Sequence, residues 1–486
     1  MINTRKSINV AFASAEAVPF VKVGGLGDVA GTLPAAVRDL DPKHLDIRVF
    51  LPFHQVIKDK NLNVTSIGEF TLPSLHGQIP CRLWLTEDKG LRIYLIDNDT
   101  ISENSAVYTG DAFQDGAKYA VFSLAVLEAI RFLDWQIDIF HANDWHTALC
   151  LYAIKTNYLE EKLFSGVKNI LSVHNLPYNG YGAQPMMTEL MITPSQDEDL
   201  PDWARFTPLP LGVQAADQII AVSKGYASEI LTPQFGSGLN EYLMKHQDKV
   251  TGIINGIDTV TWNPETDELI PERFSLADLT ARSINKAEWQ SEKGFSVNPD
   301  IPLLTVVSRL DAQKGLNLLI DSIVLALDLP WQLSVLGTGN LQIEERMYGL
   351  AEQYPDRIAF DNTYSDKIAH NLYACGDIFL MPSLYEPCGL SQMFAMRYGN
   401  IPLATAIGGL QDTITDLSED PENATGFLIR RISEKGFLSK FHQALSTFPD
   451  KPVWNRLQRN AMQKNFSWQA SASEYLKAYK QLLDLN

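Results

Sequence analysis

The pentapeptide Gly24-Gly25-Leu26-Gly27-Asp28 returns almost unchanged near the end of the chain as Gly408-Gly409-Leu410-Gln411-Asp412. Each copy comes just before a stretch with helical periodicity. A diglycine lets the backbone approach an anion closely, and the start of a helix offers unpaired N–H groups and a positive dipole end. The repeat therefore suggests two anion-binding loops, one in each half of the chain. The glycines alone leave open a chance match or two tight strand-to-helix turns.

Length, charge and cysteine content limit the class of protein. The 486 residues exceed one ordinary core, so we expect two domains and a small appendage. With 40 Lys and Arg against 58 Asp and Glu, the chain is acidic, which argues against a nucleic-acid partner. Residues 1–7 contain no apolar core of a signal peptide, and we find no apolar run that spans a bilayer. We expect an enzyme without a membrane partner.

The cysteines indicate the redox compartment. They show neither the spacing of a metal site nor that of a disulfide framework. A reducing cytoplasm fits this usage, and the stroma of a plastid remains an alternative. The four are Cys81, Cys150, Cys375 and Cys388.

Short apolar runs alternate with amphipathic stretches along both halves of the chain, which predicts two doubly wound, largely parallel sheets covered by helices on both faces. The predicted strands of the first half are residues 8–13, 46–51, 81–85, 91–96, 137–141, 169–173, 218–222 and 250–254, with helices at 28–39, 118–133 and 145–158. Those of the second half are 303–308, 332–336, 357–360, 377–381 and 401–404, with helices at 315–327, 341–353, 367–375 and 391–398.

A turn-forming cluster at residues 255–258 closes the last strand of the first half and marks the predicted domain boundary. Residues 261–267 then form an irregular linker. Ligands of open parallel sheets bind outside the carboxyl ends of the strands. We therefore expect a deep cleft between the two domains, faced by both glycine loops.

Two loops of the second half carry charged side chains after predicted strands. Arg309 and Lys314 lie in a loop just ahead of a helix, where the pair can clamp a diphosphate and neutralise a departing phosphate. Ordinary solvated surface charges are the equal alternative. Glu386 lies between Tyr385 and a Pro-Cys-Gly run, where it can bind sugar hydroxyls. The alternative for Glu386 is an acid that stabilises a helix N-terminus.

Histidines and acids follow two strands of the first half, at residues 141–146 and 173–180. No His-Glu-x-x-His or comparable ligand spacing appears, so each histidine is interpreted as a hydrogen-bonded structural residue. Residues 39–41 formally supply the Asp-x-Asp pattern of metal-dependent sugar transferases, but Pro42 follows and we interpret them as a turn. The sequence therefore predicts no metal and no cofactor.

The order and spacing of these segments resemble those of bacterial glycogen synthases and plant starch synthases, from Ala13 to residues 466–468. The segments that match are 22–29, 141–146, 173–175, 255–258, 309–315, 386–392 and 408–412. The resemblance implies a GT-B fold of two Rossmann-like domains, with residues 1–256 on the acceptor side and at part of the donor site. Residues 257–463 would bind the nucleotide sugar, and a C-terminal helix in 464–486 would cross back.

The resemblance also implies an activity: retaining transfer of glucose from ADP-glucose to the non-reducing 4-hydroxyl of an α-1,4-glucan, without metal. The implied catalytic residues are Glu386, His174, Lys314, Arg309 and Asp144. Arg309 and Lys314 would hold the phosphates, and Glu386 the glucose hydroxyls. Asp144 and His174 would line the glucosyl site, where the backbone carbonyl of His174 would stabilise the cationic sugar. Cations and N–H groups suit this chemistry because the departing ADP carries the developing negative charge.

The same resemblance implies a set of substrate-binding residues. Asp28 would support the first glycine loop, and Tyr364 would stack on the adenine. The full implied set is Lys22, Gly24, Gly25, Asp28, Asn175, Asn255, Tyr364, Cys388, Gly389, Leu390, Ser391, Gly408, Gly409 and Leu410. Retaining hydrolases use two close carboxylates, whereas only Glu386 is placed near the donor here and the position eight residues later is Phe394. A front-face mechanism, in which the leaving phosphate deprotonates the acceptor, therefore fits better than double displacement.

The chain departs from the family pattern in two places. Lys118-Tyr119 stands where the family often has Arg-Phe, and residues 98–116 match weakly, which can alter acceptor contacts. Residues 179–212 are either a loop that selects the acceptor or a disordered surface excursion.

Two alternative functions remain. The first keeps the fold but uses UDP-glucose, or a small or lipid-linked acceptor. The second is a catalytically silent glucan-binding protein. The presence of Lys22, Arg309, Lys314 and Glu386 together argues against the silent protein.

Overall fold

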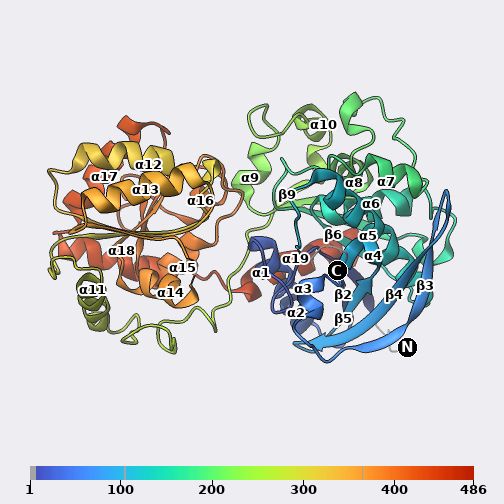
Figure 1. Cartoon of the computed structure of the whole chain (residues 1–486), viewed down its shortest axis with the longest axis horizontal. Helices are drawn as coiled ribbons and strands as arrows, with labels where there is room; N and C mark the ends of the chain where they lie inside the picture. The colour runs from blue at the N-terminus through green and yellow to red at the C-terminus, as the bar shows by residue number, and fades with distance from the viewer. Residues whose placement is uncertain (1–6, 103–105, 364, 486) are drawn as a thin grey trace. The chain divides into compact units, whose positions relative to one another are not determined.

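The structure is a computed structural model that describes residues 7–102, 106–363 and 365–485. It consists of two compact α/β units (Figure 1). Unit 1 joins the chain up to Gly256 to the segment that begins at Trp468. Unit 2 spans Ile257–Ser467. The C-terminal helix therefore belongs to the same unit as the first strand.

Unit 1 is built on a nine-stranded sheet in the order β3-β4-β5-β2-β1-β6-β7-β8-β9. In this order, all neighbours from β5 through β2 and β1 to β9 pair in parallel. At the other edge, β4 pairs antiparallel with both β3 and β5. The strands are β1 (Ile8–Ala13), β2 (Leu45–Pro52), β3 (Thr65–Ser74), β4 (Gly77–Asp88), β5 (Leu91–Asp97), β6 (Ile139–Asn143), β7 (Lys168–Val173), β8 (Gln218–Ala221) and β9 (Val250–Gly252). The sequence missed β3 because it is largely exposed and contains no apolar run.

Helices cover both faces of this sheet. The α-helices are α1 (Gly25–Ala30), α2 (Leu33–Leu40), α3 (Gln55–Lys58), α4 (Asp99–Ser102), α5 (Ala112–Phe132), α6 (Trp145–Lys155), α7 (Gln184–Glu189), α8 (Pro208–Ala215), α9 (Lys224–Glu229), α10 (Asn240–Lys245) and α19 (Trp468–Leu482); short 3₁₀ turns are Lys162–Phe164, Asp202–Ala204 and Gln247–Lys249. The helix predicted at residues 28–39 is in fact two, α1 and α2. Their junction contains Gly31, where an added Cβ would lie 2.3 Å from the Val18 carbonyl oxygen.

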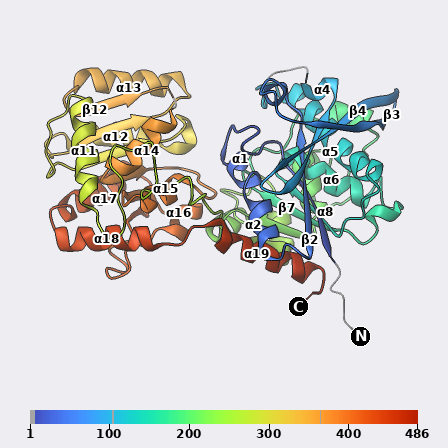
Figure 2. The same ribbon diagram turned by 90° about the horizontal axis from the view of Figure 1, so that it is seen from below.

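The C-terminal helix α19 packs against α2 in unit 1 (Figure 2). Its Tyr479 hydroxyl lies 2.7 Å from Nδ1 of His141, whose Nε2 lies 2.7 Å from the Ser172 hydroxyl. Burial lowers the pKa of His141 to about 3, so this imidazole is neutral at physiological pH. The prediction that His141 is a hydrogen-bonded structural residue is confirmed.

Unit 2 is built on a six-stranded parallel sheet in the order β12-β11-β10-β13-β14-β15. The strands are β10 (Leu303–Val307), β11 (Gln332–Leu336), β12 (Ile358–Asp361), β13 (Ile378–Met381), β14 (Ile401–Thr405) and β15 (Phe427–Ile429). The helices are α11 (Thr280–Glu292), α12 (Leu316–Ile323), α13 (Leu341–Gln353), α14 (Asp366–Cys375), α15 (Ser391–Arg397), α16 (Gly408–Thr413), α17 (Glu434–Thr447) and α18 (Lys451–Gln463), with 3₁₀ turns at Ala312–Lys314 and Val324–Ala326. The prediction of doubly wound parallel domains is confirmed.

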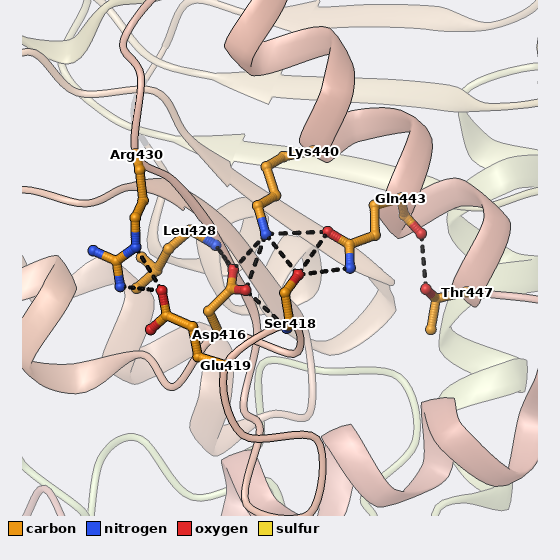
Figure 3. A network of polar contacts seen from close by, with 8 residues as sticks. All are labelled: Asp416, Ser418, Glu419, Leu428, Arg430, Lys440, Gln443 and Thr447. Carbon is orange, nitrogen blue, oxygen red and sulfur yellow. Dashed lines mark hydrogen bonds and ion pairs between the residues drawn. The ribbon is translucent and has the colours of Figure 1, made fainter.

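A buried polar network fixes β15, the edge strand that sequence patterning missed (Figure 3). The Asp416 carboxylate accepts hydrogen bonds from the Leu428 and Ser418 N–H groups and from Nζ of Lys440, at 2.9 Å to each oxygen. Burial acts to raise the pKa of Asp416, but these donors outweigh it and hold the pKa below its ordinary value. Three residues are too few for a periodic signal, so the strand depends on this tertiary contact.

The linker after the boundary is tightly packed on unit 2. The Trp262 ring stacks between His370 and Phe394, with ring centroids 3.9 and 4.1 Å away. Asp267 lies 2.7 Å from Nδ1 of His370 and accepts a hydrogen bond from the Tyr398 hydroxyl at 2.6 Å. Irregular backbone is here held by buried side chains.

Candidate active site

Two loops at the carboxyl ends of adjacent strands of unit 2 are locked together. The loop after β10 contains Lys314, and the loop after β13 contains Glu386; β10 and β13 pair directly. The Leu384 N–H donates to the Gln313 carbonyl at 2.7 Å. Gly315 has φ +66°, and an added Cβ would lie 1.9 Å from the Pro382 carbonyl oxygen. A glycine is therefore required where the two loops meet.

Lys314 and Glu386 form a partly buried ion pair. The Lys314 Nζ donates to both carboxylate oxygens, at 2.9 and 2.8 Å, and the Ser383 hydroxyl donates to Oε2 at 2.9 Å. Glu386 is 6% exposed. Neither side chain is a solvated surface charge, and Glu386 is no helix N-terminal acid, because α15 begins at Ser391 with no acid in its first turn. Sequence reasoning did not identify Ser383.

Arg309 behaves differently from Lys314. Its side chain is 60% exposed and pairs with Asp311 at 3.4 Å. The structure therefore brings Lys314 and Glu386 together but leaves Arg309 on the surface.

The second glycine loop packs on the backbone beside Glu386. The Gly409 N–H donates to the Glu386 carbonyl at 3.2 Å. An added Cβ would lie 2.1 Å from the Glu386 oxygen at Gly408 and 2.1 Å from the Cys388 oxygen at Gly409. The glycines form the first turn of α16 instead of preceding it. Close backbone packing explains this diglycine without an anion.

The remaining predicted residues of unit 2 continue the same loop. Gly389 has φ +71°, and the Gln392 amide donates to the carbonyls of Cys388 and Gly389 at 3.1 and 2.9 Å. Leu390 precedes α15, and Ser391 is its first residue. Tyr364, predicted to stack on adenine, lies outside the described residues.

In unit 1 the first glycine loop is anchored by Glu16, a residue that the sequence analysis missed. The buried carboxylate accepts hydrogen bonds from the N–H groups of Val23 and Gly24, the latter at 3.1 Å. Burial raises the pKa of Glu16 even though these donors act to lower it. Gly25 begins α1, so this diglycine too lies at the helix start. Lys22 pairs with Asp28 at 2.8 Å, as a supporting role for Asp28 requires.

The Lys118-Tyr119 pair connects to this loop through residues 106–108. The Lys118 Nζ donates to the Ala106 carbonyl at 2.8 Å, and the Tyr119 hydroxyl donates to the Val107 carbonyl at 2.8 Å. The next residue, Tyr108, donates its hydroxyl to Oε1 of Glu16 at 3.1 Å. A chain of hydrogen bonds thus runs from α5 through Glu16 to the first glycine loop.

Asp144 and His174 lie together at the ends of β6 and β7. Asp144 Oδ1 accepts the N–H groups of His174 at 2.6 Å and Asn175 at 3.2 Å. Burial raises the pKa of Asp144 to about 7 although these N–H groups lower it. Asp144 has φ +53°, a conformation that costs energy outside glycine. Burial lowers the pKa of His174 to about 4, so its imidazole is neutral.

Asn143 fixes the orientation of the His174 ring. Its Nδ2 donates to the Ala13 carbonyl at 2.9 Å, which turns Oδ1 toward Nε2 of His174 at 3.0 Å. A neutral imidazole in this contact carries its proton on Nε2. Nδ1 is then the hydrogen-bond acceptor of the ring.

Two predicted asparagines present buried acceptors. The side-chain oxygens of Asn175 and Asn255 have no hydrogen-bond partner among the residues that the structure describes. Buried acceptors without a partner are uncommon. Both oxygens are closed off from solvent in this structure, so neighbouring groups must move before either oxygen can contact a ligand.

Three further expectations concern metal, redox and membrane chemistry. All four cysteines are buried and free. Over the described ranges, no group of three or more His, Cys, Asp or Glu side chains is arranged to hold a metal ion. No helix there has the length and apolar character of a membrane span.

Comparison with known folds first defines the class of protein. The catalytic domain of starch synthase IV from Arabidopsis thaliana, solved with ADP and acarbose, superposes with a TM-score of 0.88 at 28% identity, covering 99% of this chain and 100% of that one. Sucrose-phosphate synthase from Thermosynechococcus elongatus shares the fold at a TM-score of 0.62 and 18% identity, over 98% and 99% of the two chains. The architecture is that of the GT-B glycosyltransferases.

Sequence relatives then define the family. Residues 9–245 match the starch synthase catalytic domain and residues 287–463 the glycosyl transferases group 1. Glycogen synthases of Bacillus cereus and Clostridium perfringens are 35% and 36% identical, each over 98% of this chain and 100% and 99% of theirs. The chain belongs to the glycogen synthase family.

Proposed function

We propose that the protein transfers glucose from ADP-glucose to the non-reducing 4-hydroxyl of an α-1,4-glucan with retention of configuration. The observation that carries the proposal is the partly buried Lys314–Glu386 pair with Ser383 at the carboxyl ends of β10 and β13. Support for the partners comes from the relatives, which are glycogen synthases and a starch synthase solved with ADP and acarbose. A cytoplasmic location, or a plastid stroma, fits the free cysteines.

Unit 2 is assigned the donor. Ammonium carries three protons, and Lys314 directs two of its hydrogen bonds at Glu386, which leaves the third for a phosphate oxygen. An ionised carboxylate offers about four acceptor positions. Lys314 and Ser383 fill three of them, so one remains for a glucose hydroxyl. Arg309, exposed on the surface, adds a second cation to the phosphates.

Unit 1 is assigned the acceptor and the rim of the donor sugar. Lys22 and the exposed Gly25 approach the nucleotide sugar, while Asp144 holds the His174 backbone so that its carbonyl faces the cationic sugar. His174 Nδ1, Asn175 and Asn255 accept hydrogen bonds from hydroxyl groups. Residues 179–212 are folded, as the 2.8 Å hydrogen bond from the Ser195 N–H to the Arg205 carbonyl illustrates. The disordered alternative is wrong, and acceptor selection by this segment is proposed.

The reaction is proposed to proceed on the front face. As the bond from C1 to the phosphate oxygen breaks, the acceptor O4 attacks C1 from the same side, and its proton passes to the departing phosphate. Lys314 neutralises the charge that grows on that phosphate. A second carboxylate is not available eight residues after Glu386, because Phe394 stacks there on Trp262. No metal takes part in these steps.

The test is incubation with ADP-glucose or UDP-glucose, with and without glycogen, scored by nucleotide release. We expect glycogen-dependent release of ADP that greatly exceeds that of UDP. Preferential release of UDP would show that UDP-glucose, and not ADP-glucose, is the donor. Absence of release from either donor, in a protein that binds glycogen, would favour the silent glucan-binding alternative.

A further inference from the structure

Exposed aromatic rings concentrate beside the loop that follows His174. Six aromatic side chains are largely exposed among the residues that the structure describes: Phe113, Phe132, Tyr178, Tyr181, Trp203 and Tyr348. Three of them lie on loop 175–183 or on the start of α5, against which that loop packs. Their exposed fractions are 58% for Phe113, 55% for Tyr178 and 66% for Tyr181. Large apolar surface that faces solvent in one place marks a binding site more often than scattered residues do.

Close backbone packing holds two of these rings beside each other. An added Cβ at Gly182 would lie 2.4 Å from the Ala112 carbonyl oxygen, and one at Gly116 would lie 2.5 Å from the Ala183 nitrogen. These glycines let loop 175–183 contact the first turn of α5 through the backbone. Across this contact the Phe113 and Tyr181 rings come to a centroid distance of 6.3 Å.

Hydrogen bonds fix the backbone under each ring. The Asp111 carboxylate caps α5 by accepting the Phe113 N–H at 2.8 Å and the Gln114 N–H at 3.1 Å. The Tyr181 N–H donates to the Asn179 side chain at 2.9 Å. The pair is therefore a built surface whose backbone is ordered before a ligand arrives.

We propose that Phe113 and Tyr181 form an extension platform on which a long α-1,4-glucan acceptor stacks, beyond the residues that hold its reacting end. The flat faces of aromatic rings pack against the C–H groups of pyranose rings, and polar neighbours bind the hydroxyls. Asp111 and Gln114, both exposed, supply such polar groups at the rim.

Continuity with the candidate site identifies the occupant. Tyr178, with its ring exposed, donates its N–H to the Asn175 carbonyl at 3.2 Å, and Tyr181 follows three residues later. Loop 175–183, which contains Tyr178 and Tyr181, thus starts directly after His174. This inference rests on the proposed function for the identity of the glucan, but the platform predicts binding without any donor.

The experiment measures glycogen binding and acceptor kinetics separately. Phe113→Ala, Tyr181→Ala and the double variant are run by affinity electrophoresis in gels that contain glycogen, without nucleotide. We expect the double variant to bind about tenfold more weakly, in line with the worth of an aromatic contact. Tyr181→Phe keeps the ring and should bind like the wild type. Phe132→Ala removes an exposed phenylalanine from the last turn of the same helix and is the matched control.

Kinetics distinguish an extension platform from the reacting end. With ADP-glucose, the double variant should raise the KM for glycogen much more than the KM for maltotriose, because a longer acceptor can contact the platform while its end reacts. An equal rise for both acceptors, unaltered glycogen binding, or equal weakening in Phe132→Ala would overturn the platform. Ring-dependent binding in a protein that transfers no glucose would support the platform and refute the proposed function instead.

Discussion

Each copy of the glycine pentapeptide contacts a glutamate, but the two contacts differ in kind. In unit 1 the loop donates the N–H groups of Val23 and Gly24 to the side-chain carboxylate of Glu16. In unit 2 the loop packs on the main-chain carbonyl of Glu386. The carboxylate of Glu16 therefore binds its own loop, whereas that of Glu386 binds the side chains of Lys314 and Ser383.

This difference shows that one short motif can be required for unrelated reasons. Gly408 and Gly409 are buried and leave no space for a Cβ, whereas Gly25 is exposed and a Cβ at Gly24 would meet only Oε1 of Glu16 at 3.7 Å. Backbone packing explains the second copy, whereas it does not explain the first, for which we propose access to a ligand. The two carboxylates also have different donors: backbone N–H groups bind that of Glu16 in unit 1, and the Lys314 ammonium group binds that of Glu386 in unit 2.

The largest effect is expected at the ammonium group. Lys314→Ala should lower kcat by about 10²-fold or more, because it removes the cation that neutralises the departing phosphate and leaves Glu386 without its partner. Lys435→Ala, at an exposed lysine of the same unit, is the control. Circular dichroism checks folding. Near-wild-type turnover of a folded Lys314→Ala protein would remove the phosphate assignment.

The second prediction contrasts the glycines. Gly408→Ala should lower the free energy of unfolding by about 2 kcal/mol or more, since the Cβ would collide with the Glu386 carbonyl at φ +40°. Gly24→Ala should change it by about 0.5 kcal/mol or less, because φ is −138° there and space is open. Urea unfolding measures both. Equal losses in the two variants would contradict the proposed difference between the loops.

A third prediction concerns Asp144 of unit 1, whose carboxylate accepts hydrogen bonds from backbone N–H groups. The pKa of Asp144 in the folded protein, about 7, lies above its ordinary value of 3.8, so the folded state binds the proton more tightly. The stability that this proton contributes is fully present below pH 4 and is lost as the pH rises through 7. The stability of the wild type relative to Asp144→Asn should therefore fall between pH 4 and 7 and level off above 8. A pH-independent difference in urea unfolding would refute the buried titration.

The smallest effect is expected at the far end of the Glu16 chain. Tyr108→Phe removes one hydrogen bond to Glu16, worth about 1 kcal/mol, and loosens the first glycine loop. The KM for the donor should rise a few-fold while kcat stays within about twofold. Tyr348→Phe, at an exposed tyrosine of α13, serves as control. If kcat falls as much as kcat/KM, Tyr108 acts in the transition state, and the proposal that it only stabilises the first glycine loop is wrong.

The sequence predicted the central strands well, because buried parallel strands read as apolar runs. It placed α13 at residues 341–353, as observed. It missed β3, whose side chains are mostly exposed, and β15, which depends on the Asp416 network. The edge strand β3 pairs only with the next strand, β4, whereas β15 depends on contacts more distant in sequence.

Site contacts divided in the same way. The sequence placed Lys314 and Glu386 in loops that follow two strands, so their proximity could have been predicted. It also predicted that Arg309 and Lys314 act as a pair of cations, whereas the Arg309 side chain is exposed and pairs with Asp311. Glu16 and Ser383 escaped notice because each acts on another site residue and lies outside the segments that carry the resemblance. Asn143 lies within one of those segments, residues 141–146, but was given no role. Only the hydrogen bonds reveal them.

Metal independence and retention are tested together by proton NMR of a single reaction. ADP-glucose and maltotriose are incubated with the protein and excess EDTA, and the anomeric signal of the new linkage is recorded as it forms. We predict transfer at full rate with an α-1,4 signal. A β signal would contradict the front-face mechanism. Loss of transfer that magnesium or manganese restores would contradict a transferase that needs no metal ion.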